Sequence, residues 1–254
     1  MDDHTNHALC MVLLIVVVLT VTASNLWAAQ ILVSAAMSLK DAFTEIARDF
    51  EKKYPQDKIL LNFGSSGQLQ KQIEQGAQAD VFASASVNEL NSLEKKGLII
   101  NTTRWTFARN SLVIISYHKI KAIDDLAQDG FEKLTIGDPG TVPAGKYAQE
   151  ALEHYKMYDK VKNKIIFAEN VRQVLDYVVR KEVDAGIVFT TDALTVKDPA
   201  LTVLALDAKS HEKIEYPMAV IKGTKEEGTA RLFTDFIASE TASAILKRYG
   251  FILP

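Results

Sequence analysis

From Gln30 onward, short apolar runs alternate with segments in which apolar residues recur every three or four positions. The run at 31–35 predicts a buried strand, and the following segment, with Phe43 and Phe50 on one face, predicts a helix that ends at Pro55. Further strands are predicted at 59–63, 79–85, 111–117, 134–139, 165–170, 185–189, 201–206 and 216–223. Further helices are predicted at 86–96, 143–158 and 229–248. Two more are predicted, one that ends at Gly76 and one around Val174, Leu175 and Val178.

The order of these predicted elements indicates the fold class. Strands and helices alternate with short links, which is typical of α/β proteins that have a parallel sheet with helices on both faces. A second such unit begins near residue 111, and no low-complexity linker separates it from the first. We therefore expect a two-lobed α/β protein whose ligand lies in the crevice at the carboxyl ends of the strands.

The amino-terminal segment differs in character from the rest of the chain. An uncharged apolar run extends from Ala8 to Ala23 and is shorter than the roughly 20 residues of a membrane-spanning helix. Small residues follow at Ala28 and Ala29, directly before the first predicted strand. Residues 1–29 are therefore predicted to be a signal peptide. An uncleaved anchor is the alternative, because no Lys or Arg precedes the apolar run.

Composition and charge exclude several classes of protein. The chain has 254 residues, 48% of them hydrophobic and 24% charged, so it can bury a large core. A net charge of −3 gives no reason to expect a nucleic-acid partner. The single cysteine, Cys10, lies in the predicted leader, so the mature chain is expected to have no disulfide, no cysteine-ligated metal and no thiol nucleophile.

The residues that could bind a ligand lie at the junctions between predicted strands and the helices that follow them. Taken alone, each residue there is most simply a helix cap, and Asp41 lies at the capping-box position after Ser38. Taken together, the junctions indicate an anion site, because helix starts present free N–H groups that can face one crevice. The four junctions are Ala-Ala-Met-Ser38, Ser65-Ser66, Pro143-Ala144-Gly145 and Asn170-Val171.

The junctions contain few cations. Lys and Arg are absent from residues 35–39, 63–68 and 141–145. An anion bound there would be held by neutral donors and helix dipoles, which favour geometric selectivity over affinity from charge. The chain also lacks a Gly-x-x-x-x-Gly-Lys-Ser/Thr loop, so a nucleotide phosphate site is not expected.

These junctions and several other segments resemble the substrate-binding protein of the molybdate ABC transporter. The resemblance extends over nearly all of residues 30–254, with the motifs in the family's order. The motifs are AAMSLKDAF, FGSSGQLQKQIEQGAQADVFASAS, GDPGTVPAGKYAQEAL, AENVRQVLDYV, GIVFTTDA, EYPMAVIKG and the terminal KRYGF.

The resemblance implies a type II periplasmic binding protein with a ligand cleft between two lobes. We expect residues 30–110 plus 217–254 to form one lobe and residues 111–216 to form the other. The ligand would be molybdate or tungstate, with no cofactor and no metal beyond that oxyanion. The partner would be a membrane permease driven by an ATPase, and the binding protein is expected to act as a periplasmic monomer and not as an enzyme.

The resemblance also implies which residues hold the anion. By position in the motifs, the serine ligands fall on Ser38 and Ser66, and the backbone donors fall on Ala144 and Val171. The family's tyrosine ligand, in a GIVY motif, falls on Phe189 of GIVF. Phenylalanine has no hydroxyl to donate, so this position is expected to line the pocket without a hydrogen bond unless a neighbouring threonine replaces the donor.

Other oxyanions are the first alternative. A general sulfate- or oxyanion-binding protein could share this fold, because sulfate differs from molybdate mainly in size. Phosphate can carry a proton, which would need an acceptor carboxylate in the site. Asp80 and Asp138 are the nearest candidates, and each is expected to make a structural hydrogen bond instead.

Two other classes of protein fit the sequence poorly. A serine hydrolase would need a Gly-x-Ser-x-Gly elbow with a histidine partner, and Gly64-Ser65-Ser66-Gly67 is one residue too short. None of the histidines lies at a predicted junction, and their positions are 4, 7, 118, 154 and 211. The effector domain of a regulator would need a DNA-binding segment, and residues 1–29 are too short and too apolar to be one.

Overall fold

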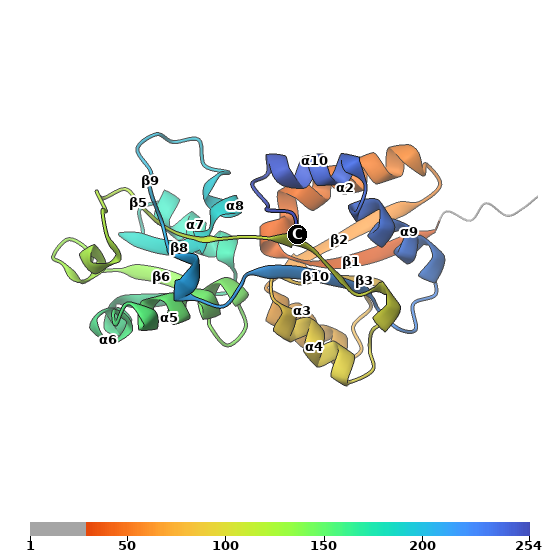
Figure 1. Cartoon of the computed structure of the whole chain (residues 1–254), viewed down its shortest axis with the longest axis horizontal. Helices are drawn as coiled ribbons and strands as arrows, with labels where there is room; N and C mark the ends of the chain where they lie inside the picture. The colour runs from red at the N-terminus through yellow and green to blue at the C-terminus, as the bar shows by residue number, and fades with distance from the viewer. Residues whose placement is uncertain (1–28) are drawn as a thin grey trace, which may run out of the picture.

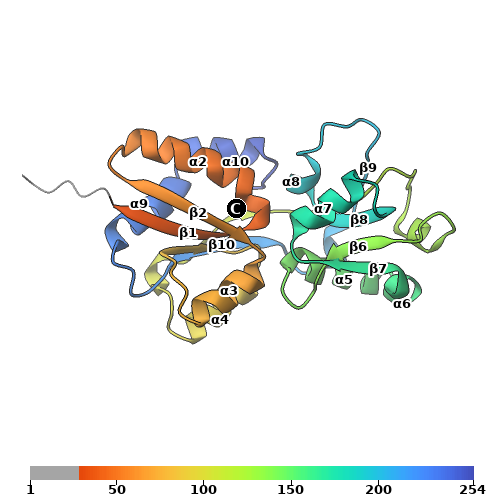
Figure 2. The ribbon, with the colours of Figure 1, turned by 180° about the vertical axis from the view of Figure 1, so that it is seen from behind.

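The computed structural model describes residues 29–254, which form two lobes lying side by side (Figure 1 and, from behind, Figure 2). Each lobe is built on one five-stranded sheet with helices against it. This confirms the predicted two-lobed α/β fold. The predicted signal peptide lies outside the described residues, apart from Ala29. Within residues 29–254, no helix has the length and apolar character that a membrane crossing requires.

The first lobe carries the sheet with strand order β2-β1-β3-β10-β4. Helices α2, α9 and α10 lie on one side of this sheet, and α3 and α4 lie on the other (Figure 1). The strands are β1 (Gln30–Ala36), β2 (Lys58–Gly64), β3 (Val81–Ala83), β4 (Trp105–Arg109) and β10 (Glu215–Val220). The helices are η1 (Met37–Leu39), α2 (Lys40–Lys53), α3 (Ser66–Glu74), α4 (Val87–Lys95), η2 (Asn101–Thr103), α9 (Glu227–Ile237) and α10 (Glu240–Arg248).

The second lobe carries the sheet with strand order β7-β6-β8-β5-β9. The strands are β5 (Leu112–Ser116), β6 (Leu134–Gly137), β7 (Ile165–Ala168), β8 (Ala185–Phe189) and β9 (Thr202–Ala205). The helices are η3 (Ile123–Ala127), α5 (Pro143–His154), α6 (Tyr158–Val161), η4 (Lys162–Lys164), α7 (Val171–Val179), α8 (Thr190–Ala193) and η5 (Ala208–Ser210). The chain crosses between the sheets twice, from β4 to β5 and from β9 to β10.

Each sheet is mainly parallel, as the sequence predicts, and contains one reversed strand. Strand β1 is parallel to β2 and β3, but β10 is antiparallel to β3 and β4. In the same way, β6 is parallel to β7 and β8, while β5 is antiparallel to β8 and β9. The reversed strands are β10 and β5, each of which follows a crossing from the other lobe and enters its sheet from the opposite end. Residue periodicity carries no information about strand direction.

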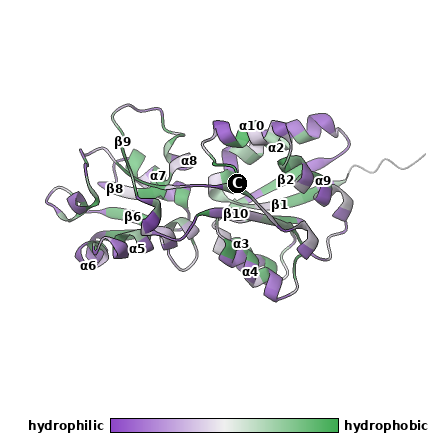
Figure 3. Cartoon of the chain, in the orientation of Figure 1, coloured by the Kyte–Doolittle hydropathy of each residue, from purple (hydrophilic) through white to green (hydrophobic). Residues whose placement is uncertain are grey.

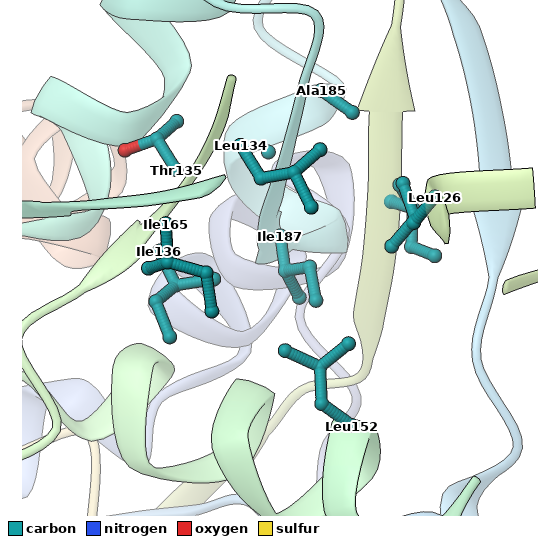
Figure 4. Close-up of a pocket in the computed structure, with 10 residues that line it drawn as sticks. Leu126, Leu134, Thr135, Ile136, Leu152, Ile165, Ala185 and Ile187 are labelled. Atoms are coloured by element: carbon teal, nitrogen blue, oxygen red, sulfur yellow. The ribbon is translucent and has the colours of Figure 1, made fainter. Parts of the chain in front are cut away.

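Apolar side chains fill the space between each sheet and its helices. Figure 3 colours much of the strands in both lobes as hydrophobic. In the first lobe, Phe50 packs edge-on against Phe233, with ring centroids 5.4 Å apart. In the second lobe, a cavity of about 10 Å³ lies beside Ile136, Leu152 and Ile187 (Figure 4). Its lining carries no charged side chain, so it belongs to the packing of the core and offers no anchor for a polar ligand.

Three elements differ from the predicted ones. The helix predicted at 229–248 is two helices, because Ser239 interrupts it and caps α10 by accepting the Ala242 N–H at 3.2 Å. The helix predicted at 143–158 ends at His154, and the chain turns at Lys156 with a φ of 56°. Strand β4 was not predicted, and it forms by pairing with β10.

Candidate oxyanion site

The carboxyl ends of strands from both sheets meet at one small cavity between the lobes. The cavity measures about 10 Å³, and all five residues named from the sequence line it: Ser38, Ser66, Ala144, Val171 and Phe189. Pockets for organic ligands usually measure several hundred Å³, so this space is too small for an organic ligand.

The two serines of the Gly-Ser-Ser-Gly segment have different roles. Ser65 is the N-cap of α3, and its hydroxyl accepts the Gln68 N–H at 3.4 Å. Ser66 is the first residue of the helix, and its buried hydroxyl accepts the Ala85 N–H at 3.0 Å. A hydroxyl has one hydrogen to donate as well as lone pairs to accept. Because Ser66 lines the cavity, its hydrogen is available to a ligand there.

Ser38 is not a helix cap, so the capping interpretation was wrong at this junction. It lies in η1, and α2 begins two residues later without a side-chain cap. The Ser38 hydroxyl instead lies 2.9 Å from the hydroxyl of Tyr216. Asp41, which the sequence placed in a capping box, faces Arg172 of the other lobe, with 2.9 Å between Oδ2 and Nη2.

Two backbone donors from the second lobe reach the same cavity. Ala144 is the second residue of α5 and Val171 is the first residue of α7, so neither N–H has an acceptor within its helix. Asn170 caps α7 by accepting the N–H groups of Arg172 and Gln173, and its cap leaves Val171 free. Among residues 29–254, the N–H groups of Ala144 and Val171 make no hydrogen bond within the protein.

The two lobes touch beside this cavity. The Gly67 N–H, at the start of α3, donates to the carbonyl oxygen of Thr141 in the second lobe at 3.0 Å. The approach leaves no space for a side chain, since a Cβ on Gly67 would lie 2.6 Å from that oxygen. The lobes are therefore in direct backbone contact beside the cavity.

No charged side chain lines the cavity among the described residues. The guanidinium of Arg172, directly after Val171, lies 2.9 Å from Asp41 and 3.1 Å from Asp192. Burial raises the pKa of Asp192 to about 6, although the Arg172 charge opposes this shift. Two carboxylates thus hold the Arg172 guanidinium, and the donors around the cavity are neutral.

Phe189 lines the cavity as a fully buried ring, with its centroid 5.9 Å from that of Tyr216. Neither of the two threonines that could replace the family's tyrosine hydroxyl lines the cavity. Thr190 lies 2.8 Å from the Ser111 hydroxyl, and Thr191 accepts a hydrogen bond from the side chain of Asn110 at 2.9 Å. Strand alternation would predict that Thr190 faces away from Phe189, but alternation does not extend to Thr190, because β8 ends at Phe189 and α8 begins at Thr190.

The two carboxylates weighed as phosphate acceptors lie away from the cavity. Asp80 accepts the Leu32 N–H at 2.6 Å and a hydrogen bond from Thr224, and Asp138 accepts the Gly140 N–H at 2.9 Å. Both are structural hydrogen bonds, as expected. The sequence did not point to Tyr216 or to the Gly67 contact, and neither has a local signal apart from its position in the EYPMAVIKG and FGSSG motifs.

Residues 31–252 match the family described as bacterial extracellular solute-binding protein. The molybdate-binding protein ModA of Haemophilus influenzae is 36% identical over 88% of this chain and 90% of its own length. The molybdate-binding protein ModA of Escherichia coli is 38% identical over 88% of this chain and 89% of its own length. Among solved structures, the periplasmic molybdate-binding protein of Azotobacter vinelandii has a TM-score of 0.82 at 26% identity, over 88% of this chain and 99% of that chain.

Proposed function

Because this chain belongs to the bacterial extracellular solute-binding proteins, with molybdate-binding proteins among its relatives, we propose that it captures molybdate or tungstate between its lobes and delivers it to an ABC transporter permease. In this proposal it is a monomer without enzymatic activity, exported to the periplasm by residues 1–29. The lobes that close are residues 30–110 plus 217–254 and residues 111–216.

The observation that carries this proposal is the donor set around the cavity. Buried N–H groups are almost always paired in native proteins, yet those of Ala144 and Val171 have no partner among the described residues. The hydroxyls of Ser38 and Ser66 come to the same space from the other lobe. A cavity with donors on both sides, and no charged group, fits a small anion that offers acceptors in several directions.

Titration with four oxyanions tests the proposal. Molybdate and tungstate are expected to raise the unfolding temperature, because a ligand present at a hundred times its Kd stabilises the native state by about 2.7 kcal/mol. Sulfate and phosphate are expected to shift that temperature far less. Calorimetric titration gives the matching affinities. Equal shifts with sulfate and molybdate would instead favour the alternative, a general sulfate- or oxyanion-binding protein.

The proposed role of Ser66 is tested by Ser66→Ala. The variant loses one hydrogen bond to a charged ligand, worth about 1.5–3 kcal/mol, so molybdate affinity is expected to fall roughly ten- to a hundredfold. Ser239→Ala is the matched control, because Ser239 caps α10 away from the cavity. The control should lose about 1 kcal/mol of stability and keep its affinity. If Ser66→Ala behaves like the control, Ser66 is not a ligand.

A further inference from the structure

A chain of buried side-chain hydrogen bonds leads away from Ser38 to the segments that join the lobes. Asn110 lies between β4 and β5, and Tyr216 lies near the start of β10. The Asn110 side-chain nitrogen donates to the Tyr216 hydroxyl at 3.1 Å, and that hydroxyl lies 2.9 Å from the Ser38 hydroxyl. Both Asn110 and Tyr216 are buried, at 8% and 0% exposure.

The direction of these hydrogen bonds is fixed from the Asn110 end. Its side-chain oxygen accepts the Ser111 N–H at 3.0 Å, so a flipped amide would set two donors against each other. Its nitrogen therefore donates, once to Thr191 at 2.9 Å and once to Tyr216.

The direction of the Asn110 hydrogen bond also determines the direction of the hydrogen bond between Tyr216 and Ser38. Burial raises the pKa of Tyr216 well above its usual value, so its hydroxyl keeps its single hydrogen. Among the described residues Ser38 is the one partner that can accept the Tyr216 hydrogen, and a buried hydroxyl hydrogen is almost always paired, so Tyr216 donates to the Ser38 oxygen. Ser38 thus accepts from Tyr216, and its own hydrogen is left for the cavity that it lines.

We propose that Asn110 and Tyr216 are positioning residues that hold Ser38 as a hydrogen-bond donor toward the anion and so make this site select oxyanions without a proton. Ser66 is held as a donor in the same way, because its oxygen accepts the Ala85 N–H and its hydrogen is left for the cavity. An oxyanion that carries a hydrogen needs an acceptor, and each serine oxygen already accepts one hydrogen bond and directs its own hydrogen at the cavity, which makes it a poorer acceptor for that hydrogen. This inference rests on the proposed oxyanion-binding function.

A double-mutant cycle tests the inference. Tyr216→Phe is expected to weaken molybdate binding about tenfold in the presence of Ser38. In the Ser38→Ala background the same change should alter affinity by less than about twofold, because the residue through which Tyr216 acts is gone. The matched control is Tyr249→Phe, which removes a hydroxyl that bonds Glu45 at 3.1 Å within the first lobe, and it should leave affinity unchanged.

The ratio of phosphate to molybdate affinity is a second measurement, and it would not change if Tyr216 had only a structural role. In Tyr216→Phe, the Ser38 oxygen can accept, so the affinity for inorganic phosphate at about pH 8 should rise relative to that for molybdate. Asn110→Asp is a second variant with a side chain of nearly the same size. Its carboxylate accepts a hydrogen bond from the Tyr216 hydroxyl, so the hydrogen bonds between residue 110 and Ser38 run in the opposite direction. The negative charge of this carboxylate repels the anion in either background, so only the part of the loss that disappears with Ser38→Ala reports the hydrogen bonds through Tyr216.

The outcomes separate the two proposals. If the wild-type protein does not bind molybdate, the proposed function fails. If the wild type binds and Ser38→Ala weakens binding, but Tyr216→Phe does not, the positioning role is wrong. Equal losses from Tyr216→Phe with and without Ser38, or an unchanged ratio of phosphate to molybdate affinity, would also overturn it.

Discussion

Replacing Gly67 with alanine is expected to weaken molybdate binding about a hundredfold or more, while the free protein remains nearly as stable as the wild type. The reason is steric. A Cβ at this position would lie 2.6 Å from the carbonyl oxygen of Thr141 and 2.9 Å from its Cα. Both are backbone atoms of the opposite lobe, which cannot move aside as the end of a flexible side chain can.

The clash opposes closure and not folding. With the lobes apart, Gly67 and Thr141 do not touch, and alanine near a helix start costs nothing relative to glycine. In the proposed site, in contrast, binding needs Ser38 and Ser66 from one lobe together with Ala144 and Val171 from the other, and all four line the cavity. A protein whose closed state is rarely populated shows an affinity reduced by that fraction.

Gly228→Ala is the control for this experiment. Gly228 is the second residue of α9, as Gly67 is of α3, and a Cβ there would meet no atom within 4 Å. Calorimetry should give the control a wild-type affinity, and X-ray scattering should show that it contracts with molybdate. If Gly67→Ala binds as tightly as this control, the contact with Thr141 does not limit closure.

Much of the fold could be predicted because apolar spacing reports how a segment packs. Strand β8 was predicted with its observed bounds, 185–189, and most other strands within one or two residues. Strand β4 was missed because its five residues are held by pairing with β10, more than a hundred positions away in the chain. The break at Ser239 was missed because apolar residues recur on both sides of it.

The candidate site was predicted in part for a related reason. Helix starts after strands have a local signature, and that signature brought Ser66 and Val171 into consideration. By itself it could not separate a capping serine from one that lines a cavity, and only the family resemblance named Ser38 as a ligand. The partner that distinguishes Ser38 is Tyr216, which lies 178 positions later in the chain. Such a contact depends on how the two crossing segments enter the lobes, and residue spacing does not encode it.

Arg172→Met is expected to destabilise the closed protein by about 3–5 kcal/mol near neutral pH, because it leaves a buried carboxylate without a cation. Asp192 is completely buried, and one of its oxygens, Oδ2, has no hydrogen-bond partner among the described residues. Its other oxygen lies 3.1 Å from Arg172. Methionine keeps the apolar stem of arginine, so the loss reports the missing charge.

The loss should grow as the pH rises. Burial already raises the pKa of Asp192 to about 6, and removal of Arg172, whose charge lowers that pKa, raises it further. Between the unfolded pKa of about 3.9 and the raised folded pKa, the native state holds a proton that the unfolded chain has released. Stability therefore falls as the pH rises through this window, and in the variant the window extends above pH 6.

Urea unfolding of Arg172→Met and wild type at about pH 5 and about pH 8 measures this effect, and the difference between the two proteins should be larger at the higher pH. Asp41→Asn is the control, since it removes the half-exposed partner of Arg172 and leaves the pair with Asp192. It should cost at most about 1 kcal/mol at either pH. A loss in Arg172→Met that is the same at both pH values would show that Asp192 does not depend on the guanidinium for its charge.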